Sequence, residues 1–387
     1  MDYQNQPLVS IVIPTLNEEL TIGEFIDWCS EGIQKAGVTG QILIIDSSTD
    51  NTPEIVKGKG AEVICVPKRG LGRAYIDSLP NIRGRYVIMG DADLTYDFRE
   101  LSPFIEKLDK GYEFVMGSRY KGYIEPGAMP PLHRYFGTPL TTWILNIMFG
   151  TKYSDIHCGM RAITYEALKK INLKSQSWEY ASEMVLKASR YKLRISEVPI
   201  KFYKDREGRL SHLKRAGWTT PWIAGWINLR IMFLYGADFF LLVPGIVIFT
   251  IGLMLVLSLL QGEYSIGPVF LNLHWMLLGL TLTTLGHSAT LLGVISRIYN
   301  NFDATFTRLI EKLITYDHGV ISGLVLFLIG FLINVNLTYV YIESGLRLTQ
   351  IYYPGVFGLL LMILGFQTFT FTLIIQMILK NNPLSTN

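Results

Sequence analysis

The sequence predicts an α/β domain in the first half of the chain and a region of four membrane-spanning helices in the second half. Hydrophobic residues make up 49% of the 387 residues and charged residues only 17%, which is too apolar for an ordinary soluble enzyme of this length. The charges are also unevenly spread, since 57 of the 67 Asp, Glu, Lys and Arg residues come before Phe239. Short strand-like segments alternate with helical segments before that point, and long uncharged segments follow it. The chain therefore joins a soluble domain to a membrane domain.

Composition excludes several classes of protein, namely disordered chains, disulfide scaffolds and fibrous repeats. The net charge of +3 gives no broad basic field, so no nucleic-acid partner is expected. Cys29, Cys65 and Cys158 lie too far apart for a zinc or redox motif. The N-terminus lacks a basic stretch followed by an apolar run, so no cleavable signal peptide is expected. We therefore expect the first half to remain on the side of the membrane where it is synthesised.

Five short segments of the first half are rich in β-branched residues and are mostly bounded by Gly, Pro or Asp, as strands are. They are residues 8–13, 41–45, 62–66, 86–89 and 113–116. Helical segments lie between several of them, at residues 20–35, 52–57, 72–77 and 98–110. This alternation predicts a mainly parallel sheet with helices on both faces, in which ligands bind outside the carboxyl ends of the strands.

Polar residues follow three of these predicted strands. Residues 14–18 follow the first strand, residues 46–50 the second and residues 90–93 the fourth. Acidic residues after strands are often only helix caps, and we favour that interpretation for Asp50. Three polar segments at one edge of a sheet instead predict a ligand site.

Asp91 and Asp93 are the sharpest signal within these segments. Two carboxylates one residue apart repel each other unless a positive charge lies close by, and a hard divalent cation is the usual solution. Mg²⁺ or Mn²⁺ held there would keep coordination positions open for phosphate oxygens. The bare pattern is most often structural, but its place directly after a strand favours a metal site.

Five motifs in this order resemble the family 2 glycosyltransferases of the A-type fold. The motifs are residues 11–18, 46–52, 91–93, 117–120 and 155–161. More narrowly, they are similar to the polyprenyl-phosphate branch, which includes dolichol-phosphate mannose synthases and bacterial polyprenyl-phosphate glucosyltransferases. The resemblance covers Leu8 to about Lys214 and implies a Rossmann-like nucleotide-sugar domain. Two departures leave the donor open: a single aspartate, Asp46, ends the second strand, and Thr95 stands where some mannose synthases carry a glutamine metal ligand.

The resemblance implies roles for individual residues. Asp91 and Asp93 would bind the metal and the donor diphosphate, and Asp155 would lie near the reacting centre. The expected nucleotide-sugar-binding residues are Pro14, Thr15, Asn17, Glu18, Asp46, Ser48, Lys68, Gly70, Gly72, Asp91, Ala92 and Asp93. The expected catalytic residues are Asp91, Asp93, Asp155, Arg119 and Arg134.

A lipid phosphate acceptor is already ionised at neutral pH, so it requires positive charge more than a general base. Arginines in otherwise uncharged loops offer planar forks to phosphate, and basic residues before the first span attract anionic lipid heads. For Arg119 and Arg161 an internal salt bridge is the alternative. The expected acceptor-binding residues are Arg119, Arg134, Arg161, Arg206, Arg209 and Lys214.

Four segments of the second half contain no Asp, Glu, Lys or Arg and reach the roughly 20 apolar residues that a bilayer requires. They lie at about residues 239–261, 264–296, 319–342 and 348–379. The domain organisation expected from them is a catalytic domain at residues 1–214, an amphipathic juxtamembrane helix at 215–238 and a membrane domain at 239–387. His274 and His287, inside the second span, could suggest a proton path, but they have no intramembrane acid near them in the sequence, so we favour hydrogen bonds between helices for both.

The loop between the second and third spans carries Arg297, Arg308 and Lys312. By the positive-inside rule this loop, the catalytic domain and both termini are cytoplasmic, at the plasma membrane of a prokaryote or at the endoplasmic reticulum. Apolar residues at helical spacing in the loop predict either a helix in the membrane interface or a plain connector.

The sequence thus predicts an integral membrane enzyme that transfers a hexose from GDP-mannose or UDP-glucose to dolichyl or undecaprenyl phosphate, with a divalent metal and with inversion. Its expected partners are the nucleotide sugar, the polyprenyl phosphate and the bilayer, and self-association through the membrane helices stays open. One alternative is a processive polysaccharide synthase, whose usual Gln-x-x-Arg-Trp motif is not matched at residues 176–178. The other is a non-enzymatic lipid-sugar transporter or scaffold.

Overall fold

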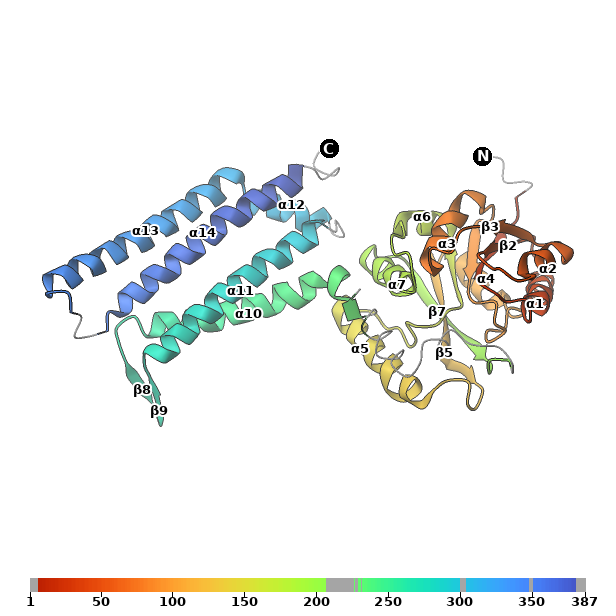
Figure 1. The fold of residues 1–387 in the computed structure, drawn as a ribbon, viewed down its shortest axis with the longest axis horizontal. Helices are drawn as coiled ribbons and strands as arrows, with labels where there is room; N and C mark the ends of the chain where they lie inside the picture. The colour runs from red at the N-terminus through yellow and green to blue at the C-terminus, as the bar shows by residue number, and fades with distance from the viewer. Residues whose placement is uncertain are drawn as a thin grey trace. The chain divides into compact units, whose positions relative to one another are not determined.

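The computed structural model describes residues 6–206, 226, 229–230, 232–299, 304–347 and 351–380. The chain divides into two compact units, Met1–Met232 and Phe233–Asn387 (Figure 1). Most of the predicted juxtamembrane helix, together with Arg209 and Lys214, lies outside the described residues. The expected domain limits at residues 214 and 238 therefore stay a prediction.

The first unit contains a seven-stranded sheet with the order β3-β2-β1-β4-β6-β5-β7. Neighbouring strands are parallel except where β6 pairs with β4 and with β5, so the prediction of a mainly parallel sheet is confirmed. The strands are β1 (Val9–Thr15), β2 (Gly40–Asp46), β3 (Glu62–Cys65), β4 (Tyr86–Met89), β5 (Phe114–Ile124), β6 (Arg161–Thr164) and β7 (Ile195–Phe202). The first five match the predicted strands, whereas β6 and β7 were not predicted.

Helices accompany the strands in the predicted alternation. In α1, Ile22, Phe25, Ile26 and Cys29 are buried, which is the spacing of a helix with one apolar face toward a core. The helices are α1 (Ile22–Lys35), α2 (Thr52–Gly58), α3 (Leu71–Ser78), α4 (Ser102–Asp109), α5 (Thr138–Phe149), α6 (Tyr165–Ile171) and α7 (Tyr180–Arg190), with short turns η2 (Leu79–Asn81) and η3 (His133–Gly137). The predicted segments correspond to α1 through α4, and α5 through α7 were not predicted.

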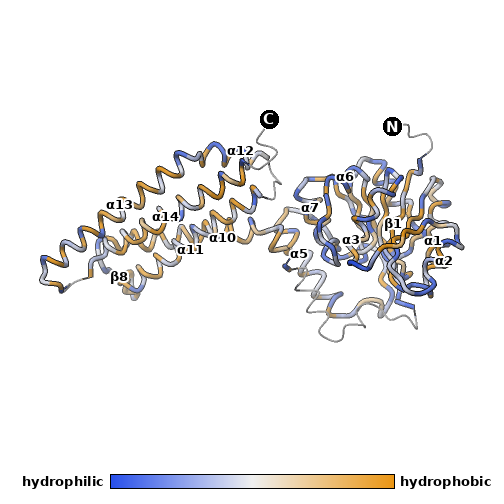
Figure 2. The backbone as a smooth tube through the Cα atoms, turned by 45° about the horizontal axis from the view of Figure 1, so that its top comes forward, coloured by the Kyte–Doolittle hydropathy of each residue, from blue (hydrophilic) through white to orange (hydrophobic). Residues whose placement is uncertain are grey.

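Among the described residues, the second unit has four helices that are long and apolar enough to cross a membrane. They are α10 (Ala237–Ser258), α11 (Leu273–Tyr299), α13 (Tyr316–Glu343) and α14 (Tyr353–Lys380), and orange, hydrophobic residues recur along all of them in Figure 2. The loop between α11 and α13 contains a further helix, α12 (Ala304–Leu313), which agrees with the first of the two alternatives for this loop, and its place in the membrane interface stays a prediction.

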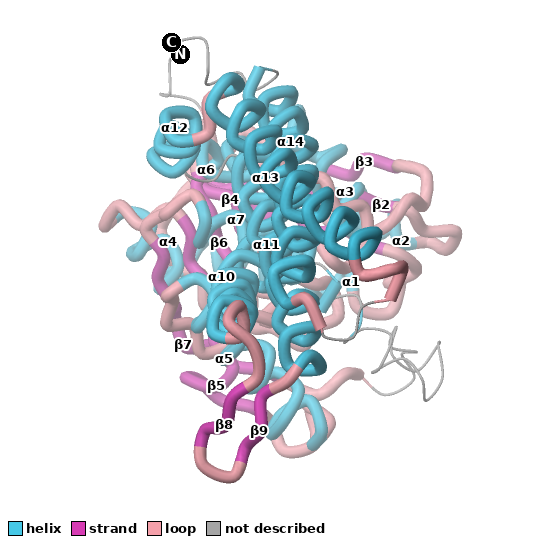
Figure 3. The backbone as a smooth tube through the Cα atoms, turned by 90° about the vertical axis from the view of Figure 1, so that its left-hand side faces the viewer, coloured by secondary structure: helices cyan, strands magenta, loops and turns pink. Residues whose placement is uncertain are grey.

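The predicted second span is wrong at its start. Instead of continuing a helix, β8 (Tyr264–Ile266) and β9 (Val269–Leu271) form an antiparallel hairpin before α11 (Figure 3). Gly267 at the tip has φ of +56°, a conformation that glycine adopts without strain. Absence of charge fits a hairpin and a helix equally well, so the composition could not distinguish them.

Glycines bring the backbones of paired membrane helices into direct contact. A Cβ added at Gly252 of α10 would lie 2.5 Å from the nitrogen of Thr283, and one at Gly286 of α11 would lie 2.3 Å from the nitrogen of Phe249. A Cβ at Gly330 of α13 would similarly lie 2.4 Å from a carbonyl oxygen of α14. Such close approach is a usual source of packing energy between membrane helices. Apolar contacts alone give little net gain there, because lipid tails make equivalent contacts with a separated helix.

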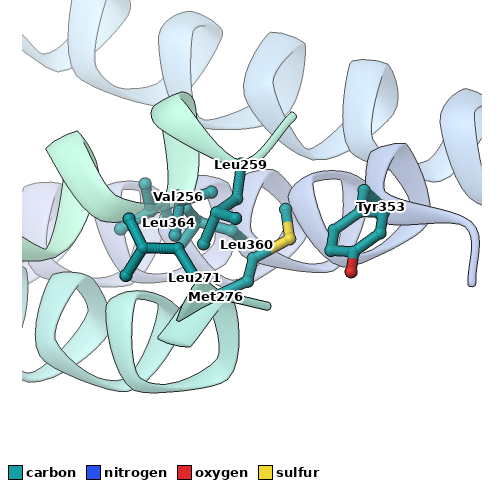
Figure 4. Close-up of a cluster of buried hydrophobic side chains, with 7 residues drawn as sticks. All are labelled: Val256, Leu259, Leu271, Met276, Tyr353, Leu360 and Leu364. Carbon is teal, nitrogen blue, oxygen red and sulfur yellow. The ribbon is translucent and has the colours of Figure 1, made fainter. Parts of the chain in front are cut away.

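Two further contacts tie α14 to the α10–α11 pair. His287 Nδ1 lies 2.9 Å from Gln367 Oε1, so the predicted hydrogen bond between helices is confirmed for His287, whereas His274 lies exposed at the start of α11. A cluster of buried apolar side chains lies at the hairpin end of the helices (Figure 4). Its members are Val256, Leu259, Leu271, Met276, Tyr353, Leu360 and Leu364.

The variant Gly286→Leu is expected to lower the free energy of unfolding by about 2 to 3 kcal/mol, because its side chain would meet the backbone of α10. Thermal unfolding of the full chain in detergent measures the change. Thr281→Leu, at an exposed position of the same helix, is the matched control and should melt with the wild type. Equal melting temperatures for the two variants would contradict a backbone contact at Gly286.

Candidate active site

A cavity of about 930 Å³ lies at the carboxyl ends of the parallel strands. Its lining includes Thr15 from the end of β1, Ser47 from the loop after β2, and both Asp91 and Asp93 from the loop after β4. The prediction that three polar segments meet at one edge of the sheet is therefore confirmed. The expected nucleotide-sugar residues that line the cavity are Pro14, Thr15, Glu18, Lys68, Gly70, Asp91, Ala92 and Asp93.

Asp46, Ser48 and Asn17 hold the walls of this cavity together without lining it. The Asp46 carboxylate is buried and accepts hydrogen bonds from Thr15 Oγ1 at 2.6 Å and from Ser48 Oγ at 2.6 Å. Asn17 adopts the left-handed conformation, with φ of +57°, and its Oδ1 accepts from the nitrogen of Thr49 at 2.9 Å. These three residues fix the loops after β1 and β2 to each other.

Asp91 and Asp93 both line the cavity. Asp93 Oδ1 accepts from the nitrogen of Thr95 at 3.0 Å and from its Oγ1 at 2.6 Å, so the backbone turn holds this carboxylate in place. Gly159 packs directly against the other carboxylate, because a Cβ there would lie 2.6 Å from Asp91 Oδ2. The motif containing Gly159 thus contacts the acidic pair.

The chemistry of this pair fits a hard divalent cation. Two carboxylates supply oxygen ligands and leave most coordination positions of Mg²⁺ or Mn²⁺ for phosphate oxygens and water. Within the described part of the chain, no group of three His, Cys, Asp or Glu side chains could hold a metal ion. A cation at Asp91 and Asp93 would therefore depend on oxygens from a bound substrate.

A loop at residues 174–178 packs on Gly70 and Gly72, two of the expected nucleotide-sugar-binding residues. Gly70 has φ of +113°, and a Cβ there would lie 2.3 Å from the carbonyl oxygen of Gln176; a Cβ at Gly72 would lie 2.2 Å from that of Ser175. Gly70 lines the cavity, and so does Trp178 from the same loop. Both glycines are therefore required for the approach of this loop, although Gly72 is not part of the cavity lining.

Glu183 of α7 holds this loop through hydrogen bonds to its backbone. Its buried carboxylate accepts hydrogen bonds from the nitrogens of Lys174 at 3.0 Å and Ser175 at 2.7 Å and forms an ion pair with buried Lys187. Burial by itself raises the pKa of Glu183, but the hydrogen bonds from Lys187 and Ser175 outweigh burial and bring that pKa below its ordinary value.

The variant Glu183→Gln is expected to lower the free energy of unfolding at pH 7 by about 3 to 5 kcal/mol, because it leaves the Lys187 ammonium buried without its counter-charge.

The stability of the wild type should also depend on pH through Glu183, because folding lowers the pKa of this carboxyl. The ionised carboxylate stabilises the fold fully above the pKa that Glu183 has in the unfolded chain. This stabilisation is lost as the pH falls through the lower pKa that Glu183 has in the folded chain. Denaturant unfolding at pH 7 and near pH 4 measures both effects. Glu166→Gln removes an exposed ion pair with Lys169 and is the control; equal losses for the two variants would contradict the prediction.

Arg119 and Asp155 form an internal ion pair. Arg119 Nε lies 2.7 Å from Asp155 Oδ2, and Nη2 lies 2.8 Å from Oδ1. Asp155 is fully buried and Arg119 nearly so, and neither lines the cavity. Glu197 of β7 holds the same loop by accepting from the nitrogen of Ser154 at 2.8 Å. The structure thus has the salt bridge that the sequence left open, and the expected catalytic roles of both residues stay predictions.

The other expected phosphate-binding residues are dispersed. Arg161 is fully buried and lines the cavity, where its Nη1 donates to the carbonyl oxygen of Ala181 at 3.0 Å and its Nη2 donates to that of Cys158. Arg134 lies in η3 with its guanidinium 5.6 Å from the ring centre of Tyr135, and Arg206 forms an ion pair with Glu24. Among the described members of this set, only Arg161 lines the cavity.

Several residues at the site were not predicted. His157, Trp178 and Tyr180 line the cavity, and so does Lys204, one of the basic residues before the first span. The signal for His157 was its place inside the motif at residues 155–161. Burial, followed by the positive charge of Arg119, lowers the pKa of His157 to about 4, so the imidazole is neutral at neutral pH.

An exposed apolar surface on η3 and α5 was missed as well. The spacing of its side chains is that of one helical face, and this spacing was the signal available in the sequence. The exposed members are Leu132, Tyr135, Phe136, Leu140, Trp143 and Ile147.

Comparisons with known proteins agree with this arrangement. Residues 10–172 match the family described as glycosyl transferase family 2, and residues 289–379 match the glycosyltransferase family 2 C-terminal transmembrane region. The low-salt glycan biosynthesis hexosyltransferase Agl6 of Haloferax volcanii is 34% identical over 366 residues, which cover 93% of this chain and 86% of that protein. The dolichyl-phosphate hexose transferase of the same organism is 30% identical over 205 residues, or 52% of this chain and 84% of that protein.

Solved structures show a weaker likeness. The glucosyl-3-phosphoglycerate synthase of Mycobacterium tuberculosis, solved with Mn²⁺, UDP and glucosyl-3-phosphoglycerate, is 22% identical and covers 58% of this chain and 81% of its own, with a TM-score of 0.44. A likeness of that size carries no argument about the site.

Proposed function

This chain belongs to the family 2 glycosyltransferases, and we propose that it transfers a hexose from a nucleotide sugar to a polyprenyl phosphate at a membrane surface. One observation carries the proposal: a single chain combines a cavity lined by Asp91 and Asp93 with four helices able to cross a membrane. The names of the two Haloferax relatives, a hexosyltransferase and a dolichyl-phosphate hexose transferase, support the hexose and the lipid phosphate.

In the proposed reaction the nucleotide sugar lies along the loops after β1, β2 and β4. Thr15, Glu18, Lys68 and Gly70 line the part of the cavity assigned to the nucleotide. Asp91 and Asp93 would hold Mg²⁺ or Mn²⁺, which when bound neutralises the departing diphosphate.

The transfer itself is an in-line displacement at the anomeric carbon. A phosphate oxygen of the lipid forms a bond to that carbon while the bond from the carbon to the diphosphate breaks, so the configuration inverts. The attacking phosphate is already ionised, and the demand on the protein is to position it and balance its charge. Arg161 and Lys204 bring positive charge to the cavity, whereas the guanidinium of Arg119 is bonded to Asp155 and is better suited to holding the loop at residues 154–160.

The exposed apolar face on η3 and α5 supports a lipid acceptor. Large apolar side chains such as Tyr135 and Trp143 are more than half exposed, and contiguous apolar surface on a soluble domain marks a protein or membrane contact. Because the chain also spans the membrane, we assign the lipid surface to this face. The basic loop between α11 and α13 is expected on the cytoplasmic side of the membrane, which favours the cytoplasmic leaflet as the one that carries the lipid acceptor.

The test is a transfer assay with the purified full-length protein. Labelled GDP-mannose and UDP-glucose are each offered with dolichyl or undecaprenyl phosphate, in Mg²⁺, in Mn²⁺ and with a chelator. One sugar is expected to appear on the lipid phosphate, and the chelator should abolish transfer. A growing polymer would favour a processive synthase, and donor binding without transfer to any acceptor would favour a transporter or scaffold.

A further inference from the structure

His157 is a cavity side chain without a role in the reaction described above. It lines the same cavity as Asp91 and lies two residues before Gly159, which packs against Asp91 Oδ2. The same loop is held by Tyr96, whose hydroxyl accepts a hydrogen bond from the nitrogen of Gly159 at 2.9 Å. His157 is therefore fixed near the end of the cavity where the donor diphosphate would bind.

A hydrogen bond joins the His157 ring to α5. His157 Nε2 lies 2.9 Å from Thr141 Oγ1. The Thr141 hydroxyl also lies 2.8 Å from the carbonyl oxygen of Gly137, one turn earlier. The carbonyl oxygen of Thr138 lies 3.1 Å from the same hydroxyl. Both carbonyls can only accept, so we infer that the hydroxyl proton is directed to them, as is usual for threonine within a helix, and that His157 Nε2 donates to Thr141.

The consequence is a hydrogen-bond acceptor on a residue that lines the cavity. In a neutral imidazole only one nitrogen carries a proton, so Nδ1 of His157 presents a lone pair. The pKa of about 4, set by burial and then by the charge of Arg119, keeps the ring in this form at neutral pH. No hydrogen bond involves Nδ1 within the part of the chain that the structure describes.

We propose that His157 Nδ1 accepts a hydrogen bond from a hydroxyl of the donor hexose and so helps to select the sugar. Phosphate oxygens accept hydrogen bonds, as Nδ1 does, and would find no proton there. The remaining donors in a nucleotide sugar are the hexose hydroxyls, the ribose hydroxyls and the base. The contact of Gly159 with Asp91 places this loop at the diphosphate end, which favours the hexose. The inference rests on the proposed function and names one of its specificity determinants.

The experiment pairs protein variants with donors that lack single hydroxyls. Deoxy analogues of the accepted hexose donor, and the corresponding 2′-deoxyribose donor, are tested with the wild type and with His157→Phe. We expect one hexose hydroxyl whose removal lowers kcat/KM of the wild type about 10-fold, and His157→Phe to lower it by a similar factor for the full donor. His157→Phe should then show the same kcat/KM for the full donor and for the donor that lacks this hydroxyl. Such coupling between the side chain and one hydroxyl would not arise from a merely structural role.

Two substitutions at Thr141 provide the matched control. Thr141→Ser keeps the hydroxyl and should preserve the response to the deoxy donor. Thr141→Val removes the acceptor for Nε2, frees the proton to occupy either nitrogen and should weaken that response. His157→Gln offers an amide oxygen and should restore part of the selectivity, and melting temperatures verify that each variant is folded.

The outcomes separate this inference from the proposed function. The inference on His157 would be overturned if His157 were coupled to the ribose hydroxyl, or if His157→Phe lost kcat/KM equally for every donor, while the wild type still transferred hexose. If the wild type transferred no hexose to polyprenyl phosphate, the proposed function would fail. Calorimetric binding of the same donors in the presence of Mn²⁺ then decides the inference by itself, because selective coupling between His157 and one hexose hydroxyl would appear in the dissociation constants.

Discussion

Replacing either Asp91 or Asp93 with asparagine is expected to lower kcat/KM for hexose transfer by about 100- to 1000-fold, the usual effect of removing one preorganised charge-stabilising group. Each carboxylate lines the cavity, and each would supply a negatively charged oxygen to the metal. An amide keeps the shape of the side chain but loses that charge, so the metal and the diphosphate bind more weakly. Single-turnover transfer assays over a range of Mn²⁺ concentrations measure the loss.

A surface carboxylate serves as the matched control for this prediction. Asp27 of α1 forms an exposed ion pair with Lys59 and lies outside the cavity, so Asp27→Asn should transfer hexose at the wild-type rate. Binding of Mn²⁺ in the presence of donor, followed by electron paramagnetic resonance, gives a second readout. If the two cavity variants bound Mn²⁺ and transferred hexose like the control, the acidic pair would have no part in the reaction.

The second large effect is expected at the ion pair between Arg119 and Asp155. Removing one partner, as in Arg119→Met or Asp155→Asn, is expected to lower the free energy of unfolding by about 3 to 5 kcal/mol, because the remaining charge stays buried alone. Both hydrogen bonds of the pair and the backbone bond from the Arg119 nitrogen at 3.1 Å are affected. Unfolding of the full chain in detergent, monitored by tryptophan fluorescence, measures the change.

The double variant Arg119→Met with Asp155→Leu distinguishes a structural pair from a catalytic one. Because neither charge is then left unpaired, most of the lost stability should return. If Arg119 instead binds the lipid phosphate directly, Arg119→Met should raise KM for the lipid at an unchanged melting temperature. Such a result would assign Arg119 to the acceptor and contradict its assignment to the loop.

The sequence predicted the parts of the fold that have simple signals. Strands such as β1 and β4 are buried on both faces, and their continuous apolar runs predicted them as strands. In the missed strand β7, Glu197, Pro199 and Lys201 alternate with buried apolar residues, as in a strand with one exposed face, but a proline inside such a run argues against a strand. The missed strand β6 begins with Arg161, a charged residue whose burial depends on hydrogen bonds to the backbone carbonyls of Cys158, just before the strand, and of Ala181 in α7.

Within the site, the sequence predicted the loops better than the orientation of side chains. Parallel topology places the loops after β1, β2 and β4 at one edge whatever their composition, and the cavity contains all three. Whether an arginine faces a cavity or an internal carboxylate depends on partners distant in the chain, as with Arg119 and Asp155. The role of His157 depends on the hydroxyl of Thr141, which belongs to a helix that the sequence did not predict.

The glycines of the membrane helices have a geometric consequence. Gly279, Gly286 and Gly293 recur every seven residues along α11, and Gly245 and Gly252 keep the same interval on α10. Seven residues fall about 20° short of two full turns of an ideal helix. If α10 and α11 were straight, their glycines would therefore no longer face each other after a few turns. To keep the glycines facing each other, the pair must wind into a left-handed supercoil, so the interval of seven encodes the handedness of the pair.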